Sequence, residues 1–194
     1  MSAQRMRLKQ IKDVRVLRGI PSSRTTTEGE IPVKSMAALR GDEPVTRFMN
    51  SDSIGFQENV VQAGDLLVGL NGAEIGHCFV AVEADGIFAP AQQIAIVRIG
   101  QTSEVDPWFL SAWFTSAQGR QQLDGLVRST VVPRISIDDF SRQQVPVPPM
   151  VDQVIVAERH RAFMESIDAH RALLISTEQL LKVELALAFA EMVG

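Results

Sequence analysis

The side chains best suited to catalysis are few in this chain and far apart. His77 and Cys78 are adjacent, and on a strand adjacent side chains point to opposite faces, so they do not form a nucleophile and base pair. His160 and His170 are ten residues apart, whereas two histidines on one helix reach a common metal at a spacing of four. The chain has no tyrosine, and Gly69-Leu70-Asn71-Gly72 lacks the spacing of a dinucleotide-binding fingerprint. We therefore expect no catalytic residue, no metal site and no cofactor.

Binding chemistry is better represented, in segments rich in glycine, serine, threonine and arginine. Arginine and lysine can hold phosphates or guanine edges, and short polar or amide side chains can read bases or fix the register on a duplex. Each loop alone could be a solvated turn, but together they suit a rigid scaffold that presents polar loops. The candidates for phosphate or guanine contacts are Arg24, Lys34, Arg47, Arg128 and Arg134, and the secondary readers are Ser35, Asn71, Gln92, Gln93, Ser129 and Thr130.

The charge distribution supports a basic face on an acidic protein. The 194 residues have a net charge of −4, which argues mildly against a nucleic-acid partner. Residues 1–24, however, hold seven Lys or Arg and one acid. A phosphate backbone senses the local face and not the total charge.

Composition excludes several other classes of protein. A hydrophobic content of 45% is enough for one sizeable core domain and an appendage. The single cysteine, Cys78, excludes an intramolecular disulfide and argues against structural zinc. No apolar run approaches the ~20 residues that span a bilayer, and the N-terminus lacks the apolar region of a secretion signal. We expect a cytoplasmic location.

Residues 1–149 are expected to form a mixed α and β domain. Extended segments are predicted near 30–33, 66–70, 75–82 and 87–99, the last most clearly over 94–99, with a type I′ hairpin turn at Asn71-Gly72. The segment 144–149 is also predicted to be extended, because residues that precede proline avoid the α region.

Two helices are predicted in the same domain. Asp106 and Pro107 predict a helix start, because aspartate caps free N–H groups and proline is tolerated at the first helical position. The apolar stripe from Phe109 to Ala117 has helical spacing and is expected in the core and not on a base-stacking surface. Ser136 predicts the cap of a second, short helix.

Residues 150–194 are expected to form one long helix. No glycine or proline lies between Met150 and Val193, and leucines recur every seven residues. A helix of this length, roughly 60 Å, needs a partner helix along its apolar seam. No second such pattern occurs in the chain, so the partner is expected to be another molecule, with His170 as a polar register-setting residue. The seam comprises Phe163, Ile167, His170, Leu173, Leu174, Leu180, Leu181 and Leu187.

Five motifs, in this order and spacing, extend over nearly the whole chain: Gly29–Met36, Gln62–Val68, Pro107–Leu110, Val132–Ile135 and Val145–Met150. They resemble the target-recognition half of the specificity subunits of type I restriction-modification systems. The resemblance implies an α+β fold, with a mixed α/β DNA target-recognition domain over 1–149 and a long dimerisation or spacer helix with coiled-coil packing over 150–194.

The resemblance also implies a function. Such subunits are non-catalytic: they bind double-stranded DNA and direct a separate methyltransferase subunit, which holds S-adenosylmethionine and modifies adenine N6, and often a restriction subunit. They hold two recognition domains apart on two antiparallel helices, so this chain resembles half a subunit. A twofold homodimer through the helix would complete the arrangement and read a palindromic, interrupted site. Pairing with a different half-subunit stays open. The alternative is a protein-interaction module that docks a partner through the helix without reading DNA.

Overall fold

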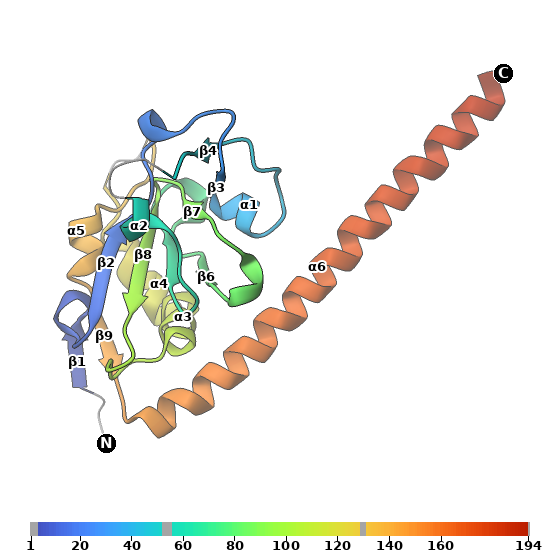
Figure 1. Cartoon of the computed structure of the whole chain (residues 1–194). Helices are drawn as coiled ribbons and strands as arrows, with labels where there is room; N and C mark the ends of the chain where they lie inside the picture. Colours follow the sequence, from blue (N-terminus) through green and yellow to red (C-terminus); the bar gives the residue numbers. More distant parts are fainter. Residues whose placement is uncertain (1–3, 52–55, 129–130, 194) are drawn as a thin grey trace. The chain divides into compact units, whose positions relative to one another are not determined.

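The computed structural model describes residues 4–51, 56–128 and 131–193. The chain divides into two compact units, Met1–Glu158 and Arg159–Gly194 (Figure 1). The strands are β1 (Gln4–Arg7), β2 (Val14–Arg18), β3 (Ile31–Lys34), β4 (Phe48–Met49), β5 (Leu66–Gly69), β6 (Cys78–Val80), β7 (Ala89–Pro90), β8 (Ile94–Ile99) and β9 (Gln144–Val147). The α-helices are α1 (Met36–Leu39), α2 (Phe56–Asn59), α3 (Pro107–Thr115), α4 (Ala117–Asp124), α5 (Ile137–Ser141) and α6 (Met150–Val193), and the short 3-10 helices are η1 (Leu8–Gln10), η2 (Ser22–Arg24), η3 (Gly72–Glu74) and η4 (Glu83–Asp85).

A four-stranded antiparallel sheet in the order β2-β8-β5-β6 forms the centre of the first unit. Its two middle strands are apolar on both faces, because each face has its own core. Leu66, Val68 and Val97 pack into one hydrophobic cluster, whereas Leu67 and Ile96 point to the opposite face and pack into another. Residues on a strand alternate between faces. A sheet covered on both sides therefore needs an uninterrupted apolar run, as residues 94–97 of β8 supply.

A second sheet has three strands in the order β4-β3-β7. In the sequence, its strands lie between those of the central sheet. β3 pairs antiparallel with β4 and parallel with β7. The short turn Ala91–Gln93 joins β7 of this sheet to β8 of the central sheet. The turn therefore lies where the two sheets meet.

The helix predicted at Asp106 is confirmed as α3. The Asp106 carboxylate accepts hydrogen bonds from the N–H groups of Trp108 (2.8 Å) and Phe109 (3.0 Å), and Pro107 occupies the first helical position. Phe109, Leu110 and Phe114 are buried, as expected for core residues. Ser136 caps α5 by accepting a hydrogen bond from the N–H of Asp139 (3.0 Å), so the second cap prediction is also confirmed.

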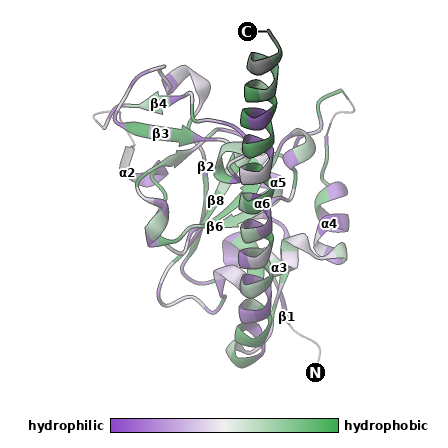
Figure 2. Ribbon diagram, turned by 90° about the vertical axis from the view of Figure 1, so that its right-hand side faces the viewer, coloured by the Kyte–Doolittle hydropathy of each residue, from purple (hydrophilic) through white to green (hydrophobic). Residues whose placement is uncertain are grey.

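The long helix α6 runs from Met150 to Val193, 44 residues. Its first turns are fixed to the first unit by the buried amide of Gln153. This amide donates to the carbonyls of Glu104 and Pro148 (both 2.8 Å) and accepts from the N–H of Asp106 (3.0 Å). Hydrophobic residues recur along the helix (Figure 2). The predicted domain boundary at Pro149 coincides with the start of α6, whereas the first compact unit includes the helix as far as Glu158.

The hairpin turn predicted at Asn71-Gly72 is wrong, although β5 and β6 do pair antiparallel. Asn71 is extended, with φ −140° and ψ 141°, and a 3-10 turn follows it. Contacts from a distant segment determine this geometry: Asn71 forms a bridge with Arg134, and the N–H of Gly72 donates to the carbonyl of Pro133 (2.8 Å). The β6 strand is also shorter than the predicted segment 75–82.

Candidate nucleic-acid interface

Two hollows in the surface of the first unit adjoin the turn Ala91–Gln93. The larger, with a volume of about 480 Å³, is called the arginine hollow here; it is lined by Arg18, Leu70, Asn71, Gln92, Gln93, Arg128, Arg134, Ile135 and Ser136. The smaller, about 240 Å³, is called the second hollow, and among its lining residues are Ser22, Thr25, Ser35, Glu43, Arg47, Gln92 and Gln93. Gln92 and Gln93 line both.

The arginine hollow is a concave cationic surface. Three guanidinium groups, from Arg18, Arg128 and Arg134, line it, and among the described lining residues there is no carboxylate. Amide and hydroxyl groups supply the remaining polar atoms. A concave surface with charge of one sign concentrates the field and attracts an anionic polymer.

The three arginines come from separate segments that backbone pairing brings together. Arg18 ends β2 and lies opposite Ala95 of β8. Arg128 and Arg134 form an antiparallel bridge, in which the N–H of Arg128 donates to the carbonyl of Arg134 (2.9 Å) and the N–H of Arg134 donates back (3.3 Å). The N–H of Ile135 donates to the carbonyl of Leu70 (2.8 Å), which fixes this bridge to the end of β5.

These guanidinium groups are available for an external anion. Within the described chain, the side chains of Arg18 and Arg134 are exposed and make no hydrogen bond or ion pair. Arg128 pairs with Asp139, Nη2 to Oδ2 2.9 Å, but its side chain is 72% exposed. Such a surface pair contributes less than about 1 kcal/mol, so a phosphate can compete for the same guanidinium.

The turn between the hollows has a fixed backbone and free side chains. The N–H of Ala91 donates to the carbonyl of Lys34 (2.9 Å), and the carbonyl of Gln93 accepts from the N–H of Leu70 (2.9 Å). The side chains of Gln92 and Gln93 are exposed, and neither amide has a hydrogen-bond partner within the described chain. Asn71 differs, because its Oδ1 is buried.

The second hollow is less basic than the arginine hollow. Ser35, one of the residues predicted there to contact bases, is already hydrogen-bonded within the domain. Arg47 is exposed at its edge. Ser35 caps α1 by accepting a hydrogen bond from the N–H of Ala38 (3.0 Å), and its hydroxyl donates to the Glu43 carboxylate. Its oxygen is therefore already engaged within the domain.

The remaining predicted contact residues lie elsewhere. Arg24 is exposed at the end of η2, and Lys34 places Nζ 4.4 Å from the centroid of the Phe88 ring, a cation–π contact. Neither lines a hollow. Ser129 and Thr130 lie outside the described residues. Arg18 was missed by the sequence prediction; the one available indication was its place in the basic N-terminal segment.

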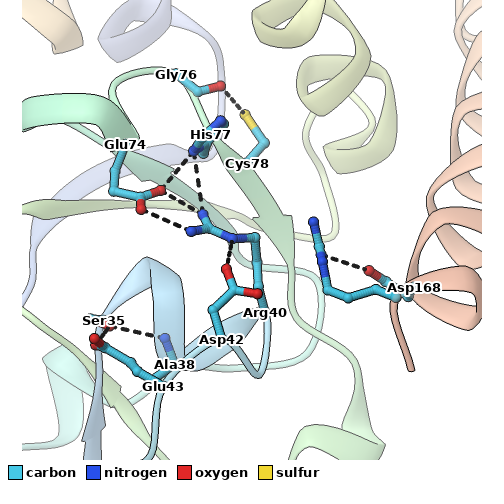
Figure 3. A network of polar contacts seen from close by, with 11 residues as sticks. Ser35, Ala38, Arg40, Asp42, Glu43, Glu74, Gly76, His77, Cys78 and Asp168 are labelled. Carbon is cyan, nitrogen blue, oxygen red and sulfur yellow. Dashed lines mark hydrogen bonds and ion pairs between the residues drawn. The ribbon is translucent and has the colours of Figure 1, made fainter. Parts of the chain in front are cut away.

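His77 and Cys78, which were considered for catalysis, line neither hollow. Figure 3 shows His77 beside Glu74 and Arg40. His77 places Nδ1 2.6 Å from Oε2 of Glu74, and Arg40 donates to both oxygens of the same carboxylate, with Nη2 to Oε1 2.8 Å. The Arg40 hydrogen bonds lower the pKa of Glu74 to about 2. Burial raises the pKa of the Cys78 thiol to about 12, which keeps it protonated and poorly nucleophilic. Among the described residues, no group of three or more His, Cys, Asp and Glu could hold a metal.

The structure is a mixed α and β domain whose last strand is followed by a long helix. Residues 3–179 match the family model of the type I restriction modification DNA specificity domain. The chain belongs to this family, and the predicted resemblance and fold class are confirmed. Among curated proteins no match is found.

Solved structures of the same architecture are similar to the chain at low sequence identity. The HsdS subunit from Thermoanaerobacter tengcongensis has a TM-score of 0.57 at 18% identity over 87% of this chain and 39% of that one. The type I restriction-modification S subunit from M. genitalium has a TM-score of 0.55 at 17% identity, over 84% and 39%. A chain from a study of assembly and conformational transition of the type I R-M system has a TM-score of 0.61 at 18% identity, over 93% and 43%. The chain therefore spans about two-fifths of the length of these proteins.

No helix in the described ranges is both long enough and apolar enough to cross a membrane.

Proposed function

We propose that this chain is a sequence-specific DNA-binding subunit of a type I restriction-modification system and that the arginine hollow is its DNA contact. The observation that supports this most directly is the convergence of three exposed arginines from separate segments, with no carboxylate among the described lining residues. Phosphate contacts from arginine position a protein on a duplex, and neighbouring polar groups read the bases.

The partner that modifies the DNA is a separate methyltransferase subunit in this proposal. Family membership supports the assignment, because the family is that of the DNA specificity domain. The chain then contributes recognition and no catalytic group, and adenine-N6 methylation takes place on the methyltransferase. In a system that also cleaves DNA, a restriction subunit joins the complex. We place this assembly in the cytoplasm.

A second copy of the chain is the proposed partner of α6. Leu173, Leu180 and Leu187 are 66%, 62% and 61% exposed within the single chain. They recur every seven residues, the spacing that keeps one seam against another helix. Of the other seam residues, Phe163, Leu174 and Leu181 are also largely exposed. The same seam on two copies is self-complementary, as a twofold dimer requires. Such a dimer would present two arginine hollows to a palindromic site.

DNA binding by charge variants tests the function. We expect the triple variant Arg18→Ala, Arg128→Ala and Arg134→Ala to bind duplex DNA at least tenfold more weakly than the wild type in anisotropy titrations. The matched control, which also removes three positive charges, is Arg7→Ala with Lys9→Ala and Lys12→Ala. These residues precede β2, whereas Arg18 ends it, so the control changes charge at the opposite end of the strand. Equal weakening in both variants would show nonspecific attraction and would refute the assigned contact.

The alternative, a protein-interaction module that does not read DNA, makes a different prediction. Such a chain would co-sediment with the methyltransferase but would leave duplex DNA unbound, with or without that partner. Sedimentation of this chain, the methyltransferase and duplex DNA, in pairs and all together, distinguishes the two proposed functions.

A further inference from the structure

Gln92 and Gln93 line two hollows, and each hollow has at least one arginine that can contact a phosphate. On one side lies the arginine hollow with Arg18 and Arg134, and on the other lies the second hollow with Arg47. The floor of a DNA major groove has the complementary arrangement, since it lies between two phosphate backbones. The groove is about 12 Å wide and admits a two-stranded ribbon, so a tight turn between two strands also fits it.

The backbone of the turn that carries Gln92 and Gln93 is fixed before any ligand binds. Four hydrogen bonds hold it: Ala91 N–H to Lys34 O (2.9 Å), Ile20 N–H to Pro90 O (2.7 Å), Ile94 N–H to Ala91 O (2.9 Å) and Leu70 N–H to Gln93 O (2.9 Å). Three of them join the turn to β3 or to the residues that follow β2 and β5, and the fourth closes the turn onto the first residue of β8. A side chain on such a turn loses little backbone freedom on binding, which favours recognition.

The two side chains have the chemistry of an adenine reader. A glutamine amide can donate to N7 and accept from the N6 amino group of adenine in the major groove, a bidentate pair that no other base offers in the same pattern. Gln92 and Gln93 are exposed, and within the described chain their amides have no competing partner. Asn71 carries the same group, but its buried Oδ1 cannot reach a base edge.

We propose that Gln92 and Gln93 are the specificity-determining residues of this domain and that they select A·T base pairs in the major groove. The inference rests on the proposed DNA-binding function and adds the class of base that the site reads. The arginines then set affinity and register, whereas the two amides set the preference among sequences.

Selection from a randomised duplex library, followed by sequencing, tests this proposal with the full chain and its methyltransferase. The wild type is expected to recover a consensus with at least one strongly preferred A·T pair. In Gln92→Ala or Gln93→Ala that preference should fall by roughly ten- to a hundredfold, while affinity for random-sequence DNA stays within about twofold. The matched control is Gln121→Ala, an exposed amide on α4 outside both hollows. It should leave the consensus unchanged.

A substitution that redirects the preference gives a second readout. Arginine pairs with O6 and N7 of guanine, so Gln92→Arg or Gln93→Arg should move the preference at the affected position toward G·C. An unchanged consensus in all glutamine variants would overturn the inference and leave the DNA-binding function intact. The inference would also be overturned if the alanine variants lost base preference only at G·C positions of the consensus. If the wild type recovers no consensus and binds no DNA, the proposed function itself fails.

Discussion

Gly19 lies so close to Ala91 that a Cβ on it would be 2.1 Å from the Ala91 carbonyl oxygen and 2.5 Å from that of Pro90. The obstacle is backbone, which cannot rotate away as a flexible side chain can. The absence of a side chain at Gly19 therefore allows β2 to pass directly beside the glutamine turn.

We predict that Gly19→Ala displaces the turn and destabilises the domain by about 1–3 kcal/mol, the usual cost of overpacking. Chemical unfolding would measure the loss, and the selected DNA consensus should weaken in parallel. Gly125→Ala is the control, because φ there is −65° and the nearest atom to the new Cβ is 3.5 Å away. Equal stability of the two variants would argue against the close approach.

The buried ion pair between Arg98 and Asp65 should contribute strongly to stability. Arg98 Nη2 lies 2.7 Å from Asp65 Oδ2, with side chains only 8% and 2% exposed. The same guanidinium donates to the carbonyls of Glu58 (3.2 Å) and Val60 (2.7 Å). Removing one partner leaves an uncompensated buried charge, so Arg98→Ala should cost about 3–5 kcal/mol in the free energy of unfolding.

An exposed pair is the comparison for this measurement. Arg161 and Glu165 are four residues apart on α6 with an Nε to Oε1 distance of 2.9 Å, and both are more than half exposed. Arg161→Ala should cost less than about 1 kcal/mol. If Arg98→Ala costs no more than this, the buried pair does not contribute strongly to stability.

The Arg40 and Glu74 contact predicts a pH dependence of stability. Its hydrogen bonds lower the pKa of Glu74 from the ordinary value of 4.5 to about 2. The folded state therefore favours the ionised carboxylate, and this contribution is fully present above pH 4.5 and is lost as the pH falls toward 2. Arg40→Ala should cost about 1–3 kcal/mol at pH 7, and its difference from the wild type should shrink between pH 4.5 and 2. Urea unfolding at a series of pH values checks this, and a constant difference would contradict it.

The α6 seam predicts a defined oligomeric state. Burying a leucine stabilises association by about 1.5–3 kcal/mol, so Leu180→Asp should convert a dimer to a monomer at the same micromolar concentration in analytical ultracentrifugation. Gln179→Asp adds the same charge to an exposed position about 100° around the helix from Leu180, away from the seam leucines, and should leave the dimer intact. A wild type that sediments as a monomer, or equal dissociation in both variants, would count against a second copy as the partner.

Local signals in the sequence predicted the elements whose conformation depends on near neighbours. Asp106 and Pro107 determine the start of α3 through their own backbone contacts, and the uninterrupted run from Met150 fixes the extent of α6. The Asn71 turn could not be predicted, because its conformation depends on pairing with Arg134, far along the chain.

In the candidate site, too, local chemistry could be predicted from the sequence, whereas the arrangement of distant residues could not. Side-chain chemistry identified Gln92, Gln93, Arg128 and Arg134 as candidates, but their meeting around one hollow depends on how the two sheets and the 128–134 bridge pack. Arg18 was missed because an exposed arginine at the end of a strand has no local mark of function. The contacts of the predicted residues with DNA stay predictions.

The salt dependence of DNA binding tests the account most directly. Each phosphate contact releases counterions, so the logarithm of affinity should fall linearly with the logarithm of salt concentration, with a slope of about −0.9 per contact. Replacing Arg18 or Arg134 by alanine should each reduce the magnitude of that slope by about one, whereas Lys12→Ala should leave it unchanged. Binding that is insensitive to salt, or slopes that are the same in all three variants, would contradict the arginine hollow as the surface that holds DNA.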